Sequence, residues 1–198
     1  MTTFIEALKK RRSIYVLGKE LKQEPKEITK IIQAAIKHSP SAFNSQSVRA
    51  VITFDEASDY IWDVTTEILE KQISKEAFAS TKEKLASFKA GKGTILFYTD
   101  EAIVKDLQEK FPLYAINFPL WAEQALGGAQ QAVWTALAQE NIGASLQHYN
   151  PLIDEVLAEK FAIPTNWRLA AQMPFGEIKQ PAQAKEFLAE KDVFKVFG

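Results

Sequence analysis

The chain is predicted to fold as an α+β domain, in which one small, mainly antiparallel sheet is flanked by helices. Three observations lead to this class. Segments with helical periodicity outnumber the short β-branched and aromatic segments, and the two kinds do not alternate one for one. A long stretch, residues 119–140, is apolar on nearly every helical face, which places it centrally or at a subunit interface. The length of 198 residues suits a single domain, residues 1–198, and no repeat or linker divides it.

The first half of the chain predicts four helices and one strand. Capping-box spacing between Thr3 and Glu6 begins the first helix, which ends near Arg12. Prolines bound the second helix, with Pro25 in its first turn and Pro40 just after its end. The remaining elements are a β-branched strand at 48–54 and two helices at 56–73 and 74–91.

The second half predicts a buried strand at 94–100, a short helix through Lys110, and then the long helix. Gly127 and Gly128 lie inside that helix, where glycine costs up to about 1 kcal/mol against alanine. They are either a tolerated pair or a place where another backbone or a flat ligand approaches closely. Asn150 and Pro151 predict the start of a further helix, and the segments 167–178 and 193–198 are expected to be strands.

Composition excludes several classes of function. The 24 basic and 25 acidic residues give a formal charge of −1, so there is no global field to attract nucleic acid or a membrane surface. The chain has no cysteine and only two histidines, so no metal site is expected. It contains no Rossmann, P-loop, hydrolase-elbow or zincin motif. With no secretion signal or apolar membrane span in the sequence, a cytoplasmic location is expected.

Three polar clusters remain as candidates for chemistry. Arg11, Arg12 and Ser13 offer two guanidinium groups and a hydroxyl, which suit either a phosphate site or the basic end of a helix. The loop 39–47 is rich in serine and amide side chains, more than a simple connection needs, although ordinary turns would also use them. The segment 143–149 presents backbone amides after a glycine.

These clusters, in this order and with the long helix between the second and third, resemble the nitroreductase family of flavin enzymes. The family's Arg-(Arg/His)-Ser motif corresponds to Arg11, Arg12 and Ser13. Its second motif is a Pro-Ser-(Ser/Ala)-x-Asn-x-Gln loop, and its third is a Gly-(Ala/Ser) segment that here begins at Gly143. The loop residues that match are Pro40, Ser41, Ala42, Asn44 and Gln46.

The resemblance implies a homodimer that binds FMN between its subunits and passes hydride from NAD(P)H to a nitroaromatic, quinone or related acceptor. The flavin carries the chemistry, so no catalytic side chain is required. Arg11, Arg12 and Ser13 of one subunit would hold the phosphate and ribityl chain, and the 40–46 loop of the other would contact the flavin. A backbone N–H would point at the flavin N5 from the segment made of Ser145, Leu146, Gln147 and His148.

One departure from the family pattern concerns the phosphate. Many members carry a second basic residue two positions after the serine, and here that position is Tyr15. The resemblance implies that the missing charge comes from elsewhere, with Lys84 and the C-terminal Lys195 as candidates. A flavin-binding sensor or storage module with little turnover, or a helical interaction protein without a cofactor, are the alternatives to an enzyme.

Overall fold

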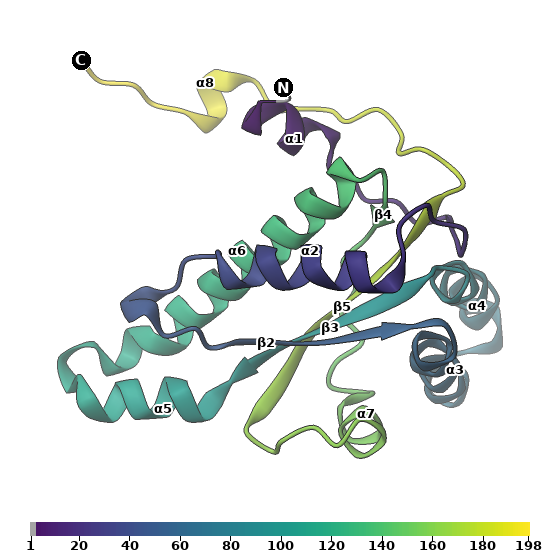
Figure 1. Ribbon diagram of the computed structural model, residues 1–198, viewed down its shortest axis with the longest axis horizontal. Coiled ribbons are helices and arrows are strands. Elements are labelled where there is room, and N and C mark those ends of the chain that lie inside the picture. Colours follow the sequence, from purple (N-terminus) through teal and green to yellow (C-terminus); the bar gives the residue numbers. More distant parts are fainter. Residues whose placement is uncertain (1–2) are drawn as a thin grey trace.

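The computed structural model describes residues 3–198, as a small sheet with helices on both faces (Figure 1). The strands are β1 (Leu17–Gly18), β2 (Val48–Phe54), β3 (Gly93–Asp100), β4 (Gly143–Ala144) and β5 (Trp167–Ile178). The α-helices are α1 (Phe4–Lys10), α2 (Pro25–Lys37), α3 (Asp55–Gln72), α4 (Lys75–Lys89), α5 (Glu101–Lys110), α6 (Phe118–Gln139), α7 (Asp154–Lys160) and α8 (Glu190–Val193). Two 3₁₀ helices are η1 (Ala42–Asn44) and η2 (Pro112–Asn117). The predicted α+β class is confirmed.

The sheet runs in the order β1-β5-β3-β2, with β4 also paired to β5, and every pair of these strands is antiparallel. Every residue of β3 is buried, because it lies between two long strands and under helices on both faces. Ile95 and Phe97 face α2 and α6, whereas Leu96 and Tyr98 face α3, α4 and α7. This strict alternation follows from the two-residue period of a strand, and it explains why the middle of the strand, residues 95–98, has a large hydrophobic or aromatic side chain at every position.

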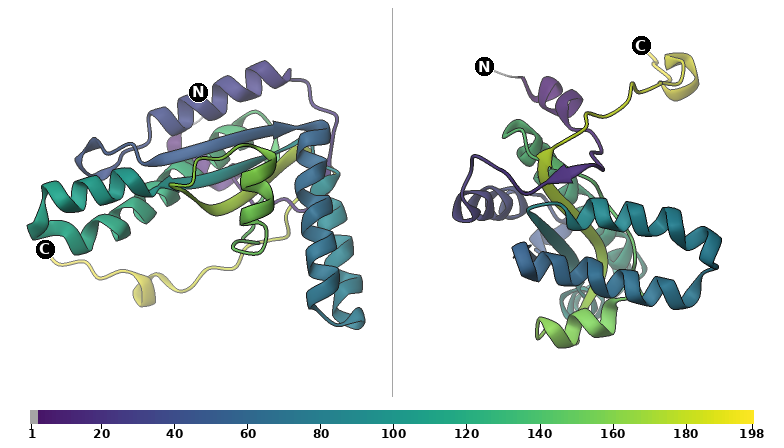
Figure 2. Two further views of the ribbon diagram at one scale, coloured as in Figure 1. Left: turned by 90° about the horizontal axis from the view of Figure 1, so that it is seen from below. Right: turned by 90° about the vertical axis from the view of Figure 1, so that its right-hand side faces the viewer.

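The two faces of the sheet are covered differently. On one face, α2 packs against α6 through side chains that include Ile28, Ile32 and Val133. On the other face, α3 and α4 lie side by side as a helical hairpin and bury Trp62 and Phe88 against the sheet (Figure 2). The helix α6 therefore has one buried face, and its other face is left to solvent in the single chain.

Two expectations about the second half of the chain are wrong. Asn150 does not cap a helix, because its side chain lies toward Gln172, from whose amide it accepts a hydrogen bond at 3.5 Å. The helix starts at Asp154 instead, after a turn that buries Ile153. The terminal segment 193–198 forms no strand: α8 ends at Val193, and the residues after it pair with no strand of the described chain.

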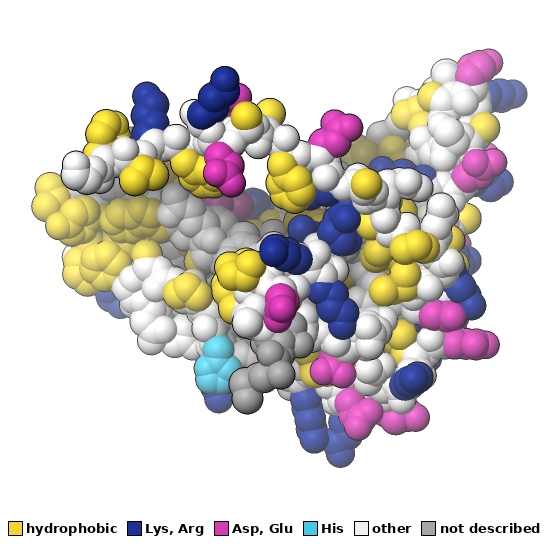
Figure 3. All heavy atoms as spheres, turned by 90° about the horizontal axis from the view of Figure 1, so that it is seen from above, with side chains coloured by type: hydrophobic (Ala, Val, Ile, Leu, Met, Phe, Trp, Pro, Cys, Tyr) yellow, Lys and Arg dark blue, Asp and Glu magenta, His cyan; other side chains and the backbone are white. Residues whose placement is uncertain are grey.

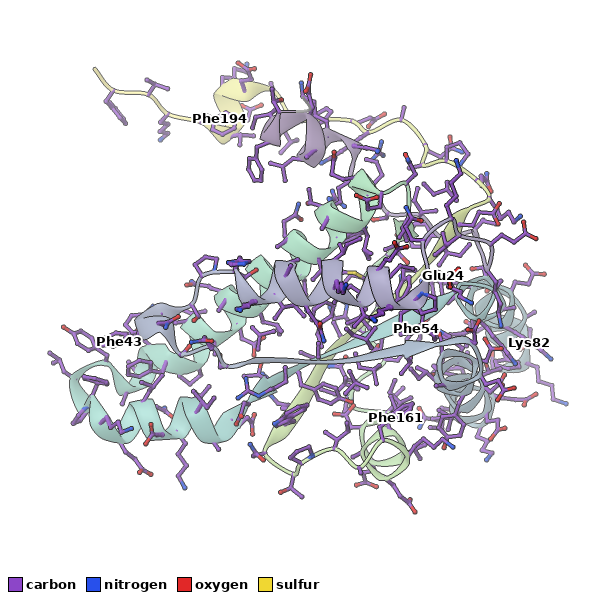
Figure 4. The ribbon with its side chains drawn as sticks, in the orientation of Figure 1. Glu24, Phe43, Phe54, Lys82, Phe161 and Phe194 are labelled. Carbon is purple, nitrogen blue, oxygen red and sulfur yellow. The ribbon has the colours of Figure 1, made fainter. Side chains whose placement is uncertain are left out.

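The last twenty residues, 179–198, form a C-terminal arm that leaves the body of the molecule after β5 (Figures 1 and 2). The arm exposes large hydrophobic side chains, and Phe194 lies on it well away from the sheet (Figure 4). These are Phe187, Leu188, Val193, Phe194, Val196 and Phe197. A soluble monomer rarely exposes so many apolar side chains in one segment, which makes this arm a candidate for contacts with a second chain.

Among residues 3–198, no helix combines the length and the apolar character that crossing a membrane requires.

Candidate functional site

The first and third polar clusters lie side by side. Ser13 forms a parallel bridge with Ala144, and the Ile14 N–H donates to the Ala144 carbonyl oxygen at 2.9 Å. The segments 11–14 and 143–148 are therefore neighbours, although about 130 residues separate them in the sequence. This brings the basic cluster to the edge of the sheet formed by β4.

The two arginines have no acidic partner in the described part of the chain. The Arg11 guanidinium lies over the Trp134 ring at 4.4 Å, and its Nε is buried without a hydrogen-bond partner among residues 3–198. Partial burial, and then the charge of Arg12, lower the pKa of Arg11 from its ordinary value. A bound anion would relieve both effects, since it supplies the missing acceptor and the missing negative charge.

A cavity of about 470 Å³ lies beside these arginines. Ser13, Tyr15 and Val16 line one wall, and residues 180–185 of the C-terminal arm line the other. The antiparallel register of β1 and β5 explains the arm's position, because the Lys179 N–H donates to the Val16 carbonyl oxygen at 3.1 Å. Farther along, Arg12 Nη2 donates to the Gln183 carbonyl oxygen at 2.6 Å.

Lys185 is the basic residue that sequence reasoning missed at this cavity. It lines the cavity together with Arg11 and Arg12. Its position depends on the pairing of β1 with β5, and β1 is too short to show a strand pattern in the sequence.

The two lysines that the sequence analysis named as candidates, Lys84 and Lys195, do not line this cavity. Lys84 is exposed on α4, with its Nζ 5.7 Å from the centre of the Phe88 ring. Tyr15 is half exposed and packs near the same Phe88 ring, with 6.4 Å between ring centres. Lys195 is exposed on the arm beyond α8 and does not line the cavity beside Arg11 and Arg12.

The segment 145–148 uses alternate backbone amides to pair with β5. The N–H groups of Ser145 and Gln147 donate to carbonyl oxygens of Pro174 and Gln172, at 3.3 and 2.7 Å. In an extended segment successive N–H groups point to opposite sides. The amides of Leu146 and His148 therefore point away from β5, and no acceptor for them is found in the described chain. These two are the amides available to a ligand.

The second polar cluster lies near the start of α6. Its residues 40–47 are called the loop 40–47 from here on. Pro40, Ser41 and Phe43 line a cavity of about 460 Å³ together with Trp121 and Gly128 of α6. A second cavity of about 530 Å³, on the α2 side of the same loop, is lined by Gln46, among others.

One chain does not bring the loop and the arginines together. Arg11 contacts Trp134 near the end of α6, and the loop lies by Trp121 near its start. These tryptophans are thirteen positions apart in the helix, which is roughly 20 Å at 1.5 Å per residue. The loop and the arginines are therefore at different ends of the same helix (Figure 1).

The face of α6 between these ends is exposed. Gln124, Gly127 and Gln131 lie on it, and a Cβ added at Gly127 or Gly128 would meet nothing within 4 Å. The glycines are therefore not required by close packing inside the chain. They leave a flat backbone surface that a second copy can approach.

No group of three or more His, Cys, Asp or Glu side chains with the spacing of a metal site occurs in residues 3–198.

Residues 8–177 match the model of the nitroreductase family, which is more than half of the chain. The chain belongs to the nitroreductase family. Membership of this family makes it an oxidoreductase. It is 45% identical to nitroreductase CinD of Lactococcus lactis, over 99% of this chain and 100% of that one, with a TM-score of 0.93. CinD has been solved in complexes with nicotinic acid, chloramphenicol and 4-nitrophenol.

Two further relatives are informative. The protein HBN1 of Saccharomyces cerevisiae is 35% identical, over 95% of this chain and 94% of its own length. A nitroreductase from Desulfitobacterium hafniense, solved with bound FMN, has a TM-score of 0.72 at 14% identity, over 98% of this chain and 97% of that one. At that identity the likeness shows a shared fold.

This nitroreductase has an aromatic cluster beside the loop, centred on Phe43, a residue that sequence reasoning did not single out. The Phe43 ring lies 4.8 Å from Phe111, 5.4 Å from Phe118 and 6.2 Å from Trp121, measured between ring centres. Phe43 is still 52% exposed. Figure 3 shows hydrophobic side chains gathered at one end of the molecule. In η2, which contributes Tyr114 to the rings around Phe43, Leu113 and Ile116 are also exposed.

Proposed function

We propose that this protein is a homodimeric, FMN-dependent NAD(P)H oxidoreductase that reduces nitroaromatic, quinone or related planar acceptors. The single observation that carries the proposal is the arginine pair beside β4. Arg11 and Arg12 are partly buried, lack a carboxylate partner in the described chain, and line a cavity of about 470 Å³. The D. hafniense nitroreductase of the same fold was solved with FMN, which supports FMN as the occupant.

The residues present fit the phosphate of FMN. Arg11, Arg12 and Lys185 supply three cations around one cavity, and Ser13 adds a hydroxyl donor. Guanidinium groups bind phosphate oxygens through charge-assisted hydrogen bonds, often in pairs. In this proposal Lys185 supplies the charge that Tyr15 does not, with Lys84 and Lys195 as the alternative candidates.

The same surface fits a flavin ring. The free amides of Leu146 and His148 are available to donate toward a ring nitrogen, next to buried Ser145 and Gln147. The loop of Pro40, Ser41, Ala42 and Asn44 would reach the ring from a second copy, with Gln46 nearby. The exposed glycine face of α6 suits the contact between the two copies.

When bound, FMN supplies the hydride chemistry that connects NAD(P)H to the acceptor. The chain's own task is then to hold the cofactor, to orient the two substrates in turn and to keep water away. It needs no nucleophile or metal for this, because positioning and electrostatics are what the protein contributes.

The acceptor is proposed to be a planar aromatic or quinone. The cavity beside the loop is lined mainly by apolar groups, with Phe43 and Trp121 on its wall. CinD, which is 45% identical, was solved with nicotinic acid, chloramphenicol and 4-nitrophenol, and all three contain an aromatic ring. Aromatic side chains bind such rings through offset or edge contacts.

The visible spectrum of the purified protein tests the proposal. The protein is expected to be yellow, or to become yellow with added FMN, and the flavin absorbance is expected to bleach anaerobically when NAD(P)H is added. Protein that is colourless after incubation with excess FMN and removal of the unbound FMN would refute the assignment. A bound flavin that NAD(P)H does not reduce would also refute it.

The alternative is a flavin-binding sensor or storage module. It is motivated by Tyr15, which removes one positive charge from the usual pattern. Turnover distinguishes the two functions: rapid steady-state oxidation of NAD(P)H with menadione or a nitroaromatic compound excludes a module that only binds. Should FMN not bind at all, a helical interaction protein is the remaining candidate.

A further inference from the structure

The loop 40–47 has a strained backbone. Phe43, Asn44 and Gln46 have positive φ angles of 56°, 50° and 48°, although none of them is glycine. Residues with side chains rarely adopt this left-handed conformation, and for a bulky residue such as Phe it is especially unfavourable. Several such residues persist together only where the surroundings determine the backbone from outside the loop.

The loop's own hydrogen bonds close its turns. The Asn44 and Ser45 N–H groups donate to the carbonyl oxygens of Ser41 and Ala42, both at 3.0 Å, and the Gln46 N–H donates to Ser41 Oγ at 2.9 Å. All of these partners belong to the loop itself. They define its local shape, but they do not fix it relative to the sheet.

Arg49, in β2, connects the loop to the sheet. Its Nη1 donates to the Gln46 carbonyl oxygen at 2.7 Å and to the Val48 carbonyl oxygen at 3.0 Å. Its Nη2 donates to Asp100 Oδ2 at 2.9 Å. One planar guanidinium group thus holds a carbonyl of a strained residue and a nearly buried carboxylate at the same time.

Asp100 is itself fixed in place at the junction of β3 and α5. Its Oδ1 accepts from Asn166 Nδ2 at 2.7 Å and from the Ala102 N–H at 3.1 Å, and so caps α5. Its N–H donates to the Ser47 carbonyl oxygen at 2.8 Å. The loop is therefore tied to this junction twice, at Gln46 through Arg49 and at Ser47 directly.

We propose that Arg49 is a positioning residue for the loop 40–47, which it holds in its strained form by joining the Gln46 carbonyl to Asp100. This rests on the proposed function, in which the loop contacts the flavin. Arg49 does not line the cavity beside Phe43 and Trp121, although it lines the cavity of about 530 Å³ on the α2 side of the loop. Its bond to the Gln46 carbonyl oxygen is the route by which it acts on the loop.

A lysine cannot replace this arginine. The guanidinium group presents its donors in a rigid plane, so it reaches the carbonyls and the carboxylate in different directions. An ammonium group is a compact charge on a flexible chain, and it would keep the ion pair with Asp100 while losing the fixed geometry at Gln46. A lysine at position 49 would therefore keep the positive charge but is expected not to hold the loop in its strained form.

The test compares Arg49→Lys with the wild-type protein and with Arg168→Lys as a matched control. Arg168 also bridges carboxylates at this end of the molecule, Glu101 at 2.8 Å and Glu123, but it bonds no atom of the loop. In Arg49→Lys, amide hydrogen exchange in residues 41–47 is expected to be about tenfold faster, because the loop opens more often. The exchange in β3 and α6 is expected to stay unchanged.

Kinetics and thermal unfolding distinguish a role of Arg49 in positioning the loop from a general role in stabilising the fold. Arg49→Lys is expected to raise the KM for a nitroaromatic acceptor about fivefold and to weaken FMN binding, with an unchanged melting temperature of the apoprotein. Arg168→Lys is expected to change none of these. Wild-type exchange in the loop together with a wild-type KM in Arg49→Lys would overturn the inference. If the wild-type protein binds no FMN, the proposed function fails, and the hydrogen-exchange result still decides the role of Arg49.

Discussion

Lys185 illustrates how a single side chain depends on a strand register. It reaches the arginine cavity because β5 runs antiparallel to β1 and leads the arm past Ser13. Its sequence surroundings, in a polar segment near the C-terminus, contain no sign of this position.

Lys185→Ala is expected to weaken FMN binding about tenfold, because one charge-assisted bond to phosphate at a partly exposed site is lost. Titration of apoprotein with FMN, followed by flavin fluorescence, measures the change. Lys195→Ala is the matched control, since Lys195 is a lysine of the same arm outside the cavity. A larger loss in Lys195→Ala than in Lys185→Ala would assign the phosphate contact to Lys195.

Asp154 is a second residue whose properties depend on its surroundings, because the fold changes the pKa of its carboxyl group. Its Oδ1 is buried without a hydrogen-bond partner in the described chain. Burial raises the pKa of this carboxyl above its ordinary value of 3.8, and Arg168 offsets part of that rise. Burial, together with the charge of Asp154, also raises the pKa of Tyr98.

A raised pKa in the folded state means that the folded protein binds the proton more tightly than the unfolded chain does. The free energy of unfolding is then highest below the ordinary pKa and falls as the pH rises through the folded-state pKa. Asp154→Asn is expected to raise the free energy of unfolding at neutral pH by a few tenths of a kcal/mol, at most about 1, because water screens a partly exposed group. Urea unfolding at neutral and acidic pH measures this. The two proteins should become equal in acid, and a variant less stable at neutral pH contradicts the prediction.

At the scale of elements, the loop 40–47 shows how an aromatic cluster and a hydrogen-bond network hold one segment from two sides. Phe43 packs among rings of η2 and α6, and Arg49 fixes the other end. In Figure 4 Phe43 lies at one end of the molecule, far from Phe161 at the end of α7.

Phe43→Ala is expected to raise the KM for a planar aromatic acceptor about 3- to 10-fold, the equivalent of one lost aromatic contact. FMN affinity should fall less than in Arg49→Lys, because the loop's hydrogen bonds, which come from its backbone and Ser41, remain. Phe161→Ala serves as the control, since it removes an aromatic contact with Tyr60 on the far face. Steady-state kinetics decides: an unchanged KM in Phe43→Ala would place the acceptor elsewhere.

At the scale of the whole molecule, the two halves of the candidate site lie at opposite ends of α6. In the proposed homodimer, the second copy would bring its loop 40–47 to the arginines of the first. The exposed face of α6 and the apolar C-terminal arm are surfaces that such a copy would cover.

Gly127→Leu is expected to yield a monomer that loses FMN. The added side chain has free space in the single chain, so folding is preserved, but it prevents close approach of a second α6. Light scattering after gel filtration measures the mass. Ala86→Leu adds a comparable side chain at an exposed position of α4 and should remain dimeric. A Gly127→Leu protein that is dimeric and fully loaded with FMN would show that α6 is not the interface.

The sequence by itself determined the elements that local rules control. The capping box at Thr3, the buried strand β3 and the length of α6 follow from periodicity and hydrogen bonding within a few residues. The α+β class and the family resemblance also came from the order of these segments. Local patterns failed at Asn150 and at the C-terminus, because a turn near Gln172 and an arm without a sheet edge depend on distant neighbours.

The tertiary structure decided which of the predicted site residues meet. It joined the arginines to Ala144 through a bridge across the chain and brought Lys185 beside them through the register of β1 with β5. It also separated them from the loop by much of the length of α6. The physical reason is that charge and periodicity are properties of neighbouring residues. Strand pairing and helix length, in contrast, set the distances between residues that are far apart in the sequence.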